Sequence, residues 1–206
     1  MQKALTEKEA EEFLEKQGFK IAKRTTAKKI EDITSIQKKI SFPWAMKVSS
    51  SKVIHKVKVG GVILNIDNSM KAQEAFDKLS KIDNFEEVLI QEMFSGDEAI
   101  IGIKKTPEFG HVIMFGKGGS NVEKEKDVSF RVLPASKKEI QAMIKETKFS
   151  KILEEKGADF KLIENILLKM EKLIKEHQNI IELDINPLII TKNSAKIIDA
   201  RMILEE

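Results

Sequence analysis

The segment IIELDINPLIITKNSAKIIDARMIL, residues 180–204, contains the clearest structural pattern in the chain. In its first half, apolar residues alternate with Glu182, Asp184 and Asn186, which predicts a half-buried strand whose three oxygen-bearing side chains share one face. Its second half predicts another strand after a turn at TKNS. A hairpin between the two strands should bring Asp199 beside Asn186.

Two interpretations of this polar face are open: a solvated face of an edge strand, or an oxygen-ligand site. A small number of hard oxygen ligands suits magnesium, which takes the rest of its shell from water and substrate phosphates. Pro187 directly follows Asn186. Since proline cannot donate a ladder hydrogen bond, we expect the pairing to end there and the polar end of the strand to face a cleft, which favours a metal site.

Away from this segment, the sequence predicts a mixture of helices and strands. Thr6 and Glu9 form a capping box and Gly18 a stop signal, which predicts a helix over 7–17. The pattern also predicts a weaker helix at 31–40 and a helix that begins at Ser69. Short apolar runs predict strands at WAMKV, VGGVILNI, EVLIQEM, EAIIGIKK, GHVIMFG and VSFRVL, followed by two helices, the second over 159–177. Because these elements do not alternate regularly, we expect an α+β fold in two lobes.

A basic segment with a glycine pair lies between two of the predicted strands. Lys47 falls in an apolar strand, where a lysine is costly unless its ammonium has a partner such as a phosphate; the alternative is a lysine that reaches out from an edge strand. His55 is surrounded by lysines and by Gly60 and Gly61, which permit close approach of a ligand. A second glycine group, in FGKGGSNVE, offers a flexible loop with exposed amides. The other histidines, His111 and His177, are expected to be structural or solvated.

Composition excludes several functional classes. The chain has 206 residues, no cysteine, and 36 Lys plus Arg against 33 Asp plus Glu, with the two signs interleaved. The lack of cysteine excludes disulfides and thiolate catalysis, and the interleaved charges argue against a nucleic-acid partner. No apolar run approaches the ~20 residues that span a bilayer, so we expect no membrane partner and a cytoplasmic location.

Four segments, taken in order, resemble the ATP-grasp domain of ADP-forming (NDP-forming) acyl-CoA synthetases, a relative of succinyl-CoA synthetase β. They are FPWAMKVSSSKVIHKVKVGGVILNI, LIQEMFSGDEAIIGIKKTPEFGHVIMFGKGG, NVEKEKDVSFRVLP and ELDINPLII...IIDARMIL. The resemblance covers nearly the whole chain. It implies one ATP-grasp domain over 1–206, with a smaller lobe at 20–95, a larger lobe at 96–206 joined by the helix at 7–17, and the nucleotide between them.

The resemblance also implies a reaction: acyl-CoA, ADP and phosphate give acid, CoA and ATP, reversibly. An α subunit binds CoA and carries a phosphohistidine, and the chain passes that phosphate to ADP with Mg²⁺. The implied site residues are His55 as phosphate relay, Asp184 as the acid that receives the phosphohistidine, Lys47 with Gly60 and Gly61 at the phosphates, Gln91, Glu92 and Met93 at the adenine hinge, Glu98 near the ribose, and Asn186 and Asp199 as magnesium ligands.

Two other functions are open. One is a self-contained ATP-grasp carboxylate ligase, which would not need His55. The other is a nucleotide-responsive binding module without catalysis. The chain also departs from the family pattern, with Thr106 where an aspartate is common before Pro107 and a short loop at 154–159. The acyl group, the choice of adenine or guanine nucleotide and the subunit stoichiometry are not specified by the sequence.

Overall fold

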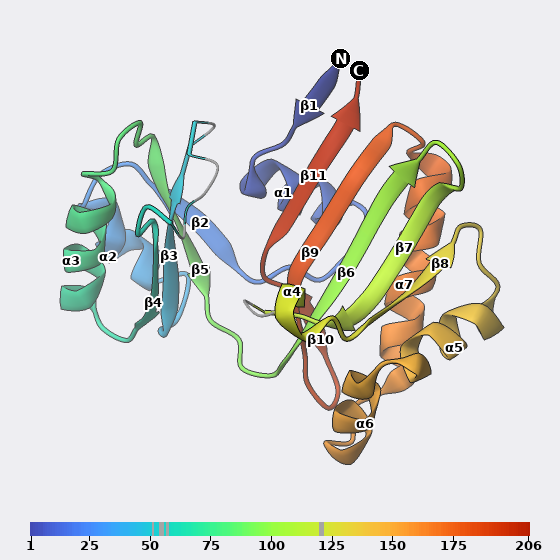
Figure 1. Ribbon diagram of the computed structural model, residues 1–206. Coiled ribbons are helices and arrows are strands. Elements are labelled where there is room, and N and C mark those ends of the chain that lie inside the picture. The colour runs from blue at the N-terminus through green and yellow to red at the C-terminus, as the bar shows by residue number, and fades with distance from the viewer. Residues whose placement is uncertain (51, 54–55, 57, 120–121) are drawn as a thin grey trace. The chain divides into compact units, whose positions relative to one another are not determined.

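A computed structural model describes residues 1–50, 52–53, 56, 58–119 and 122–206. The chain divides into two compact units, and each is described by itself (Figure 1). Unit 1 combines Met1–Ile21 with Ser95–Glu206, and unit 2 consists of Ala22–Phe94. Unit 2 is therefore inserted into the sequence of unit 1. The assignment of 1–206 to one ATP-grasp domain, with lobes at 20–95 and 96–206, stays a prediction.

Unit 1, over its described residues, contains a seven-stranded sheet in the order β1-β11-β9-β6-β7-β8, with β10 also paired to β9. These strands pair in antiparallel fashion. The strands are β1 Gln2–Ala4, β6 Asp97–Thr106, β7 Gly110–Lys117, β8 Val128–Val132, β9 Ile180–Ile190, β10 Ala195–Ile197 and β11 Ala200–Glu205. The helices are α1 Glu7–Lys16, α4 Val122–Glu125, α5 Lys137–Glu146, α6 Lys148–Glu155 and α7 Phe160–Glu176.

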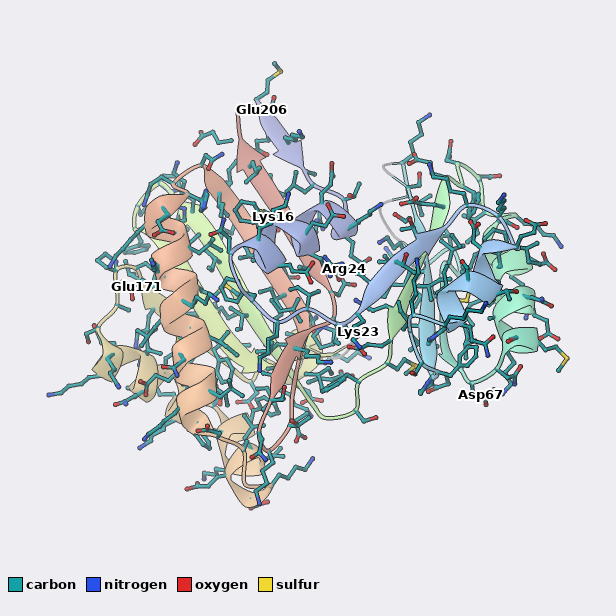
Figure 2. All side chains as sticks on the ribbon, turned by 180° about the vertical axis from the view of Figure 1, so that it is seen from behind. Lys16, Lys23, Arg24, Asp67, Glu171 and Glu206 are labelled. Carbon is teal, nitrogen blue, oxygen red and sulfur yellow. The ribbon has the colours of Figure 1, made fainter. Side chains whose placement is uncertain are left out.

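The core of unit 1 lies between this sheet and helices that cover one of its faces. Seen from behind, α1 and α7 lie in front of the strands (Figure 2). Leu183 and Ile185 of β9 are fully buried against residues from these helices, including Leu14 and Leu167. Because side chains alternate along a strand, Asp184 projects from the opposite face of the sheet.

Unit 2 contains a four-stranded sheet in the order β2-β5-β3-β4. Its strands are β2 Arg24–Ala27, β3 Trp44–Ser49, β4 Val62–Ile66 and β5 Glu87–Glu92, and its helices are α2 Asp32–Gln37 and α3 Ser69–Leu79. Trp44, Met46 and Val48 form one core cluster with apolar residues of the two helices. The alternate residues of β3 therefore occupy the other face of this sheet.

The capped helix near the N-terminus is confirmed, whereas the cap of a second helix and the number of helices after the β-rich region need correction. Thr6 and Glu9 form the expected capping box at the start of α1. The helix predicted at Ser69 does begin there, but its cap is Asn68, whose side chain accepts a hydrogen bond from the Lys71 amide. Two helices were expected after the β-rich region, but Thr147 ends α5 and caps α6, so three longer helices follow there in the described chain.

An ion pair joins β8 to α5. Arg131 donates to both carboxylate oxygens of Glu146, at 2.5 and 3.0 Å, and Ser129 donates to the same carboxylate. The hydrogen bonds from Arg131, and then that from Ser129, lower the pKa of Glu146 from 4.5 to about 2. A lowered pKa means that the ionised form stabilises the fold above the usual pKa and that this contribution is lost as the pH falls.

Glu146→Gln is therefore expected to lower the melting temperature slightly at pH 6, because this solvent-exposed pair contributes little. The difference from wild type should shrink as the pH falls from 4.5 toward about 2. Thermal unfolding followed by circular dichroism across this range tests the prediction. Glu155→Gln, at an exposed position of α6, is the matched control and should show no such pH dependence. A Glu146→Gln difference that persists below pH 2 would contradict the prediction.

Candidate functional site

Strand β9 continues through Pro187, so the predicted end of the ladder at this residue is wrong. The strand runs to Ile190, and the proline is accommodated by a bulge in which the two residues 186 and 187 lie opposite Ile100 of β6. On the other side of β9, pairing with β11 ends at Ile185 and pairing with β10 begins at Leu188. Pro187 thus lies where neither neighbouring ladder requires its missing donor.

The predicted hairpin is confirmed, and it brings Asn186 beside Asp199. The turn at residues 191–194 is closed by a 2.8 Å hydrogen bond from the Thr191 amide to the Ser194 carbonyl. The backbone N–H of Asn186 donates to the backbone carbonyl of Asp199 at 3.2 Å. Asp199 lies just before β11, and both residues are half-buried.

The glycine loop after β7 meets Asn186, but it does not offer the exposed amides that were expected at these residues. The Gly118 amide donates to the Glu98 carbonyl at 2.7 Å. The Gly119 amide donates to Asn186 Oδ1 at 2.8 Å. A side chain on Gly119 would collide with the Glu98 carboxylate, so these glycines permit close packing. The loop thus groups Glu98, Gly119 and Asn186.

Asp184 lies on the face of the sheet opposite the core helices, between two neighbouring strands. It lies opposite Arg201 of β11 and Gly102 of β6. Burial raises the pKa of Asp184, and the charge of Glu182 raises it further, while Arg201 opposes both effects. Two strand steps of about 3.3 Å each separate Asp184 from Asn186. The fold therefore places a disfavoured negative charge near the grouped residues.

The oxygen donors of this region suit a magnesium ion that also binds water and phosphate better than a metal ion bound only by protein side chains. No group of three or more His, Cys, Asp or Glu in the described part of the chain could hold a metal ion. Magnesium needs fewer protein ligands, because it keeps waters and binds substrate phosphates. The side-chain oxygen of Asn186, within β9, and the carboxylate of Asp199, whose backbone is bonded to Asn186, are such a set. These residues would hold the ion.

Lys47 lies on an interior strand of unit 2. It pairs with Leu89 of β5 and Val62 of β4, and it is 5% exposed. The alternative of a lysine on an edge strand is wrong, because β3 has a neighbour on each side. Lys47 and Gln91 share the sheet face that points away from α2 and α3, since Gln91 pairs with Ala45. The structure thus brings these two predicted site residues together.

Gly60 and Gly61 lie in the turn before β4, which begins only at Val62. Gly60 has a φ of +70°, which favours glycine. A side chain on Gly61 would lie 2.6 Å from Val48 Cγ1, and the Gly61 carbonyl accepts a 2.8 Å hydrogen bond from the Val48 amide. Packing of the turn therefore explains both glycines, and their role at the phosphates stays a prediction.

The predicted adenine hinge lies at the end of β5. The Glu92 amide donates to Lys23 O at 2.9 Å, and Glu92 Oε1 accepts from the Lys23 amide at 2.9 Å. The Met93 amide donates to Pro43 O at 3.0 Å. These bonds fix the backbone of the segment within unit 2.

The structure does not test His55, because it lies outside the described residues. The structural interpretation of the other two histidines is confirmed. His111 is buried, with Nε2 2.8 Å from the Ile180 carbonyl, and His177 packs edge-on against Phe13 with ring centroids 5.0 Å apart.

Sequence reasoning missed the use of Gly118 and Gly119 as partners of Glu98 and Asn186. The only available signal was the glycine pair itself, since the contact joins residues 67 positions apart.

No helix in the described chain is long and apolar enough to cross a membrane.

Comparison with known proteins gives one family. Residues 1–204 match a family described as ATP-grasp domain. The chain is 39% identical over 207 residues to acetate–CoA ligase [ADP-forming] II of Archaeoglobus fulgidus, covering 98% of this chain but 30% of that protein. It is 36% identical over 212 residues to the β subunit of acetate–CoA ligase [ADP-forming] I of Pyrococcus furiosus, covering 97% of this chain and 91% of the relative.

Solved structures agree with this family. The dinucleotide-forming acetyl-coenzyme A synthetase 1 of Ca. Korarchaeum cryptofilum, in complex with coenzyme A and Ca-AMPCP, superposes with a TM-score of 0.90 at 35% identity, covering 98% of this chain and 94% of the other. A second complex contains Mg-AMPPCP, with its phosphohistidine segment pointing towards the nucleotide-binding site. It superposes with a TM-score of 0.85 at 34% identity, covering 98% and 94% of the two chains.

Proposed function

Because this chain belongs to the ATP-grasp domain family and has its fold, we propose that it is the nucleotide-binding β subunit of an ADP-forming acyl-CoA synthetase. The observation that carries the proposal is that Asn186 contacts both Gly119, which packs against Glu98, and Asp199, and lies two residues from Asp184. The chain spans 30% of the first relative but 91% of a separate β subunit. These lengths support an α subunit as partner, and we place the complex in the cytoplasm.

The proposed reaction is phosphoryl transfer to ADP. The phosphorus–nitrogen bond of the α subunit's phosphohistidine breaks as a bond forms to a His55 ring nitrogen. The bond to His55 then breaks as a β-phosphate oxygen of ADP attacks, which yields ATP. Asp184 receives the incoming phosphohistidine, and Lys47 with Gly60 and Gly61 lies at the phosphates. Positioning and charge neutralisation supply most of the acceleration in such a transfer.

The remaining residues bind the nucleotide and its metal. Gln91, Glu92 and Met93 contact adenine, and Glu98 lies near the ribose. Asn186 and Asp199 hold Mg²⁺, which neutralises phosphate charge when bound.

Copurification with an α subunit, followed by an assay of ATP formed from acetyl-CoA, ADP and phosphate, tests the proposal. We expect ATP formation only when both subunits are present. If the chain alone couples an acid to an amine or thiol with ATP, it is a self-contained ligase instead. If it binds ADP but supports no phosphate transfer with any α partner, it is a binding module.

Lys47→Met is expected to weaken ADP binding about 10- to 150-fold, because a hydrogen bond to a charged group contributes ~1.5–3 kcal/mol. Methionine has a similar length, so it should keep the packing of this 5% exposed position. Isothermal titration with MgADP measures the change. Lys78→Met, at an exposed position of α3, is the matched control and should bind like wild type. Equal affinity of Lys47→Met and wild type would contradict the role at the phosphates.

A further inference from the structure

The side chain of Asn186 is matched to the two backbone polar groups of Gly119. Its Oδ1 accepts the Gly119 N–H at 2.8 Å, and its Nδ2 donates to the Gly119 carbonyl at 3.4 Å. A carboxamide carries its acceptor and its donors on different atoms, and so does the backbone of a single residue, which has one N–H donor and one carbonyl acceptor. The pairing therefore determines which end of the Asn186 amide is the oxygen.

The Gly119 peptide is itself held in place. Its φ is +94°, a conformation that favours glycine, and the Glu98 carboxylate occupies the space where a side chain would be. The preceding residue, Gly118, donates its amide to the Glu98 carbonyl at 2.7 Å. The backbone of Gly119, which orients Asn186, thus packs against β6, a different strand from the one that carries Asn186.

We propose that the backbone of Gly119 is a positioning element for the magnesium site, and that position 186 consequently requires an amide rather than a carboxylate. The inference rests on the proposed function, because it assigns Mg²⁺ to Asn186. An amide oxygen has two acceptor sites. The Gly119 N–H takes one of them, and the other would be left for the metal.

This inference and the assumption that Asn186 is only an oxygen ligand predict opposite effects of aspartate at position 186 on Mg²⁺ binding. If Asn186 were only an oxygen ligand, aspartate would bind Mg²⁺ at least as well, since hard cations prefer carboxylates. In the observed pairing, aspartate places an oxygen against the Gly119 carbonyl where Nδ2 now donates. The carboxylate must turn away from that carbonyl, and the orientation of the ligand is lost.

The first experiment measures ADP affinity of the full chain by isothermal titration, with and without Mg²⁺. The ratio of the two affinities reports metal binding, because the coupling between metal and nucleotide is reciprocal. We expect Asn186→Asp to reduce this ratio about 10- to 100-fold, the usual effect of losing a partner that orients a metal ligand. Asn193→Asp, the same change at an exposed position of the hairpin turn, is the control and should leave the ratio unchanged.

A ratio for Asn186→Asp equal to or above that of wild type overturns the inference. Failure of the proposed nucleotide site is a different result, because wild type would then show no ADP binding with or without Mg²⁺.

The second experiment needs neither metal nor nucleotide. In Asn186→Ala, exchange of the Gly119 amide proton measured by NMR should be about tenfold faster than in wild type, since loss of a net hydrogen-bond energy of ~1.4 kcal/mol corresponds to that factor. The Gly118 amide, bonded to the Glu98 carbonyl, serves as internal control and should keep its rate. Unchanged exchange at Gly119 overturns the inference, and a general loss of protection identifies an unfolded variant, in which case Asn186→Ser replaces it.

Discussion

His55→Ala is expected to reduce ATP formation by the complex of the two subunits by at least ~10⁴-fold, while ADP still binds with wild-type affinity. Removal of a residue that forms a covalent intermediate typically has an effect of this size or greater, because no other group carries the transferred phosphate. Binding is retained because the imidazole acts on the phosphate in transit and not on the adenine or the metal.

Two measurements separate the relay from other roles of His55. Rapid quenching after mixing phosphorylated α subunit with wild-type chain should reveal acid-labile phosphate on this chain, and His55→Ala should show none. His177→Ala, which removes a half-buried histidine at the end of α7, is the matched control and should keep both label and turnover. Unchanged turnover in His55→Ala would show that phosphate passes directly to ADP.

Asp184→Asn is expected to lower ATP formation about 10²- to 10⁴-fold, the range for a side chain that acts on a proton or imidazole in the transition state. The same variant should be at least as stable as wild type at pH 7. Burial raises the pKa of Asp184, so the charged carboxylate destabilises the fold at pH values above its usual pKa, and asparagine removes this cost.

Thermal unfolding in metal-free buffer tests the stability half of this prediction, and the coupled assay tests the activity half. Glu182→Gln makes the same kind of change two residues away on the same face and should keep most of the activity. A large fall in melting temperature for Asp184→Asn would mean that the carboxylate is structural. The combination of higher stability and lower activity is the expected mark of a charge retained for function.

The sequence predicted most elements of the fold because their signals are local. The capping box of α1, the alternation in β9 and the turn at residues 191–194 all depend on residues a few positions apart. β1 and β2 were missed, since they are short and gain their order from pairing with β11 and β5. Asn68 was overlooked as a helix cap because Ser69 carries an equally good capping signal.

The candidate site was less predictable, because its contacts are remote in sequence. The hairpin geometry did predict that Asn186 and Asp199 meet, as the structure confirms. The bulge at Pro187 could not be predicted from β9 alone, since it depends on how β6, β10 and β11 divide the pairing. The bond from Gly119 to Asn186 likewise depends on β7 and β9 lying on either side of β6.

The insertion of unit 2 into unit 1 has a consequence for synthesis on the ribosome. All residues of unit 2 are made before most of unit 1, and its strands pair within 22–94. The first strand of unit 1 instead pairs with the last, Gln2 opposite Glu205. Unit 2 can therefore complete its sheet while the nascent chain is still growing, whereas the segment 1–21 has to wait for the final strand to emerge from the exit tunnel.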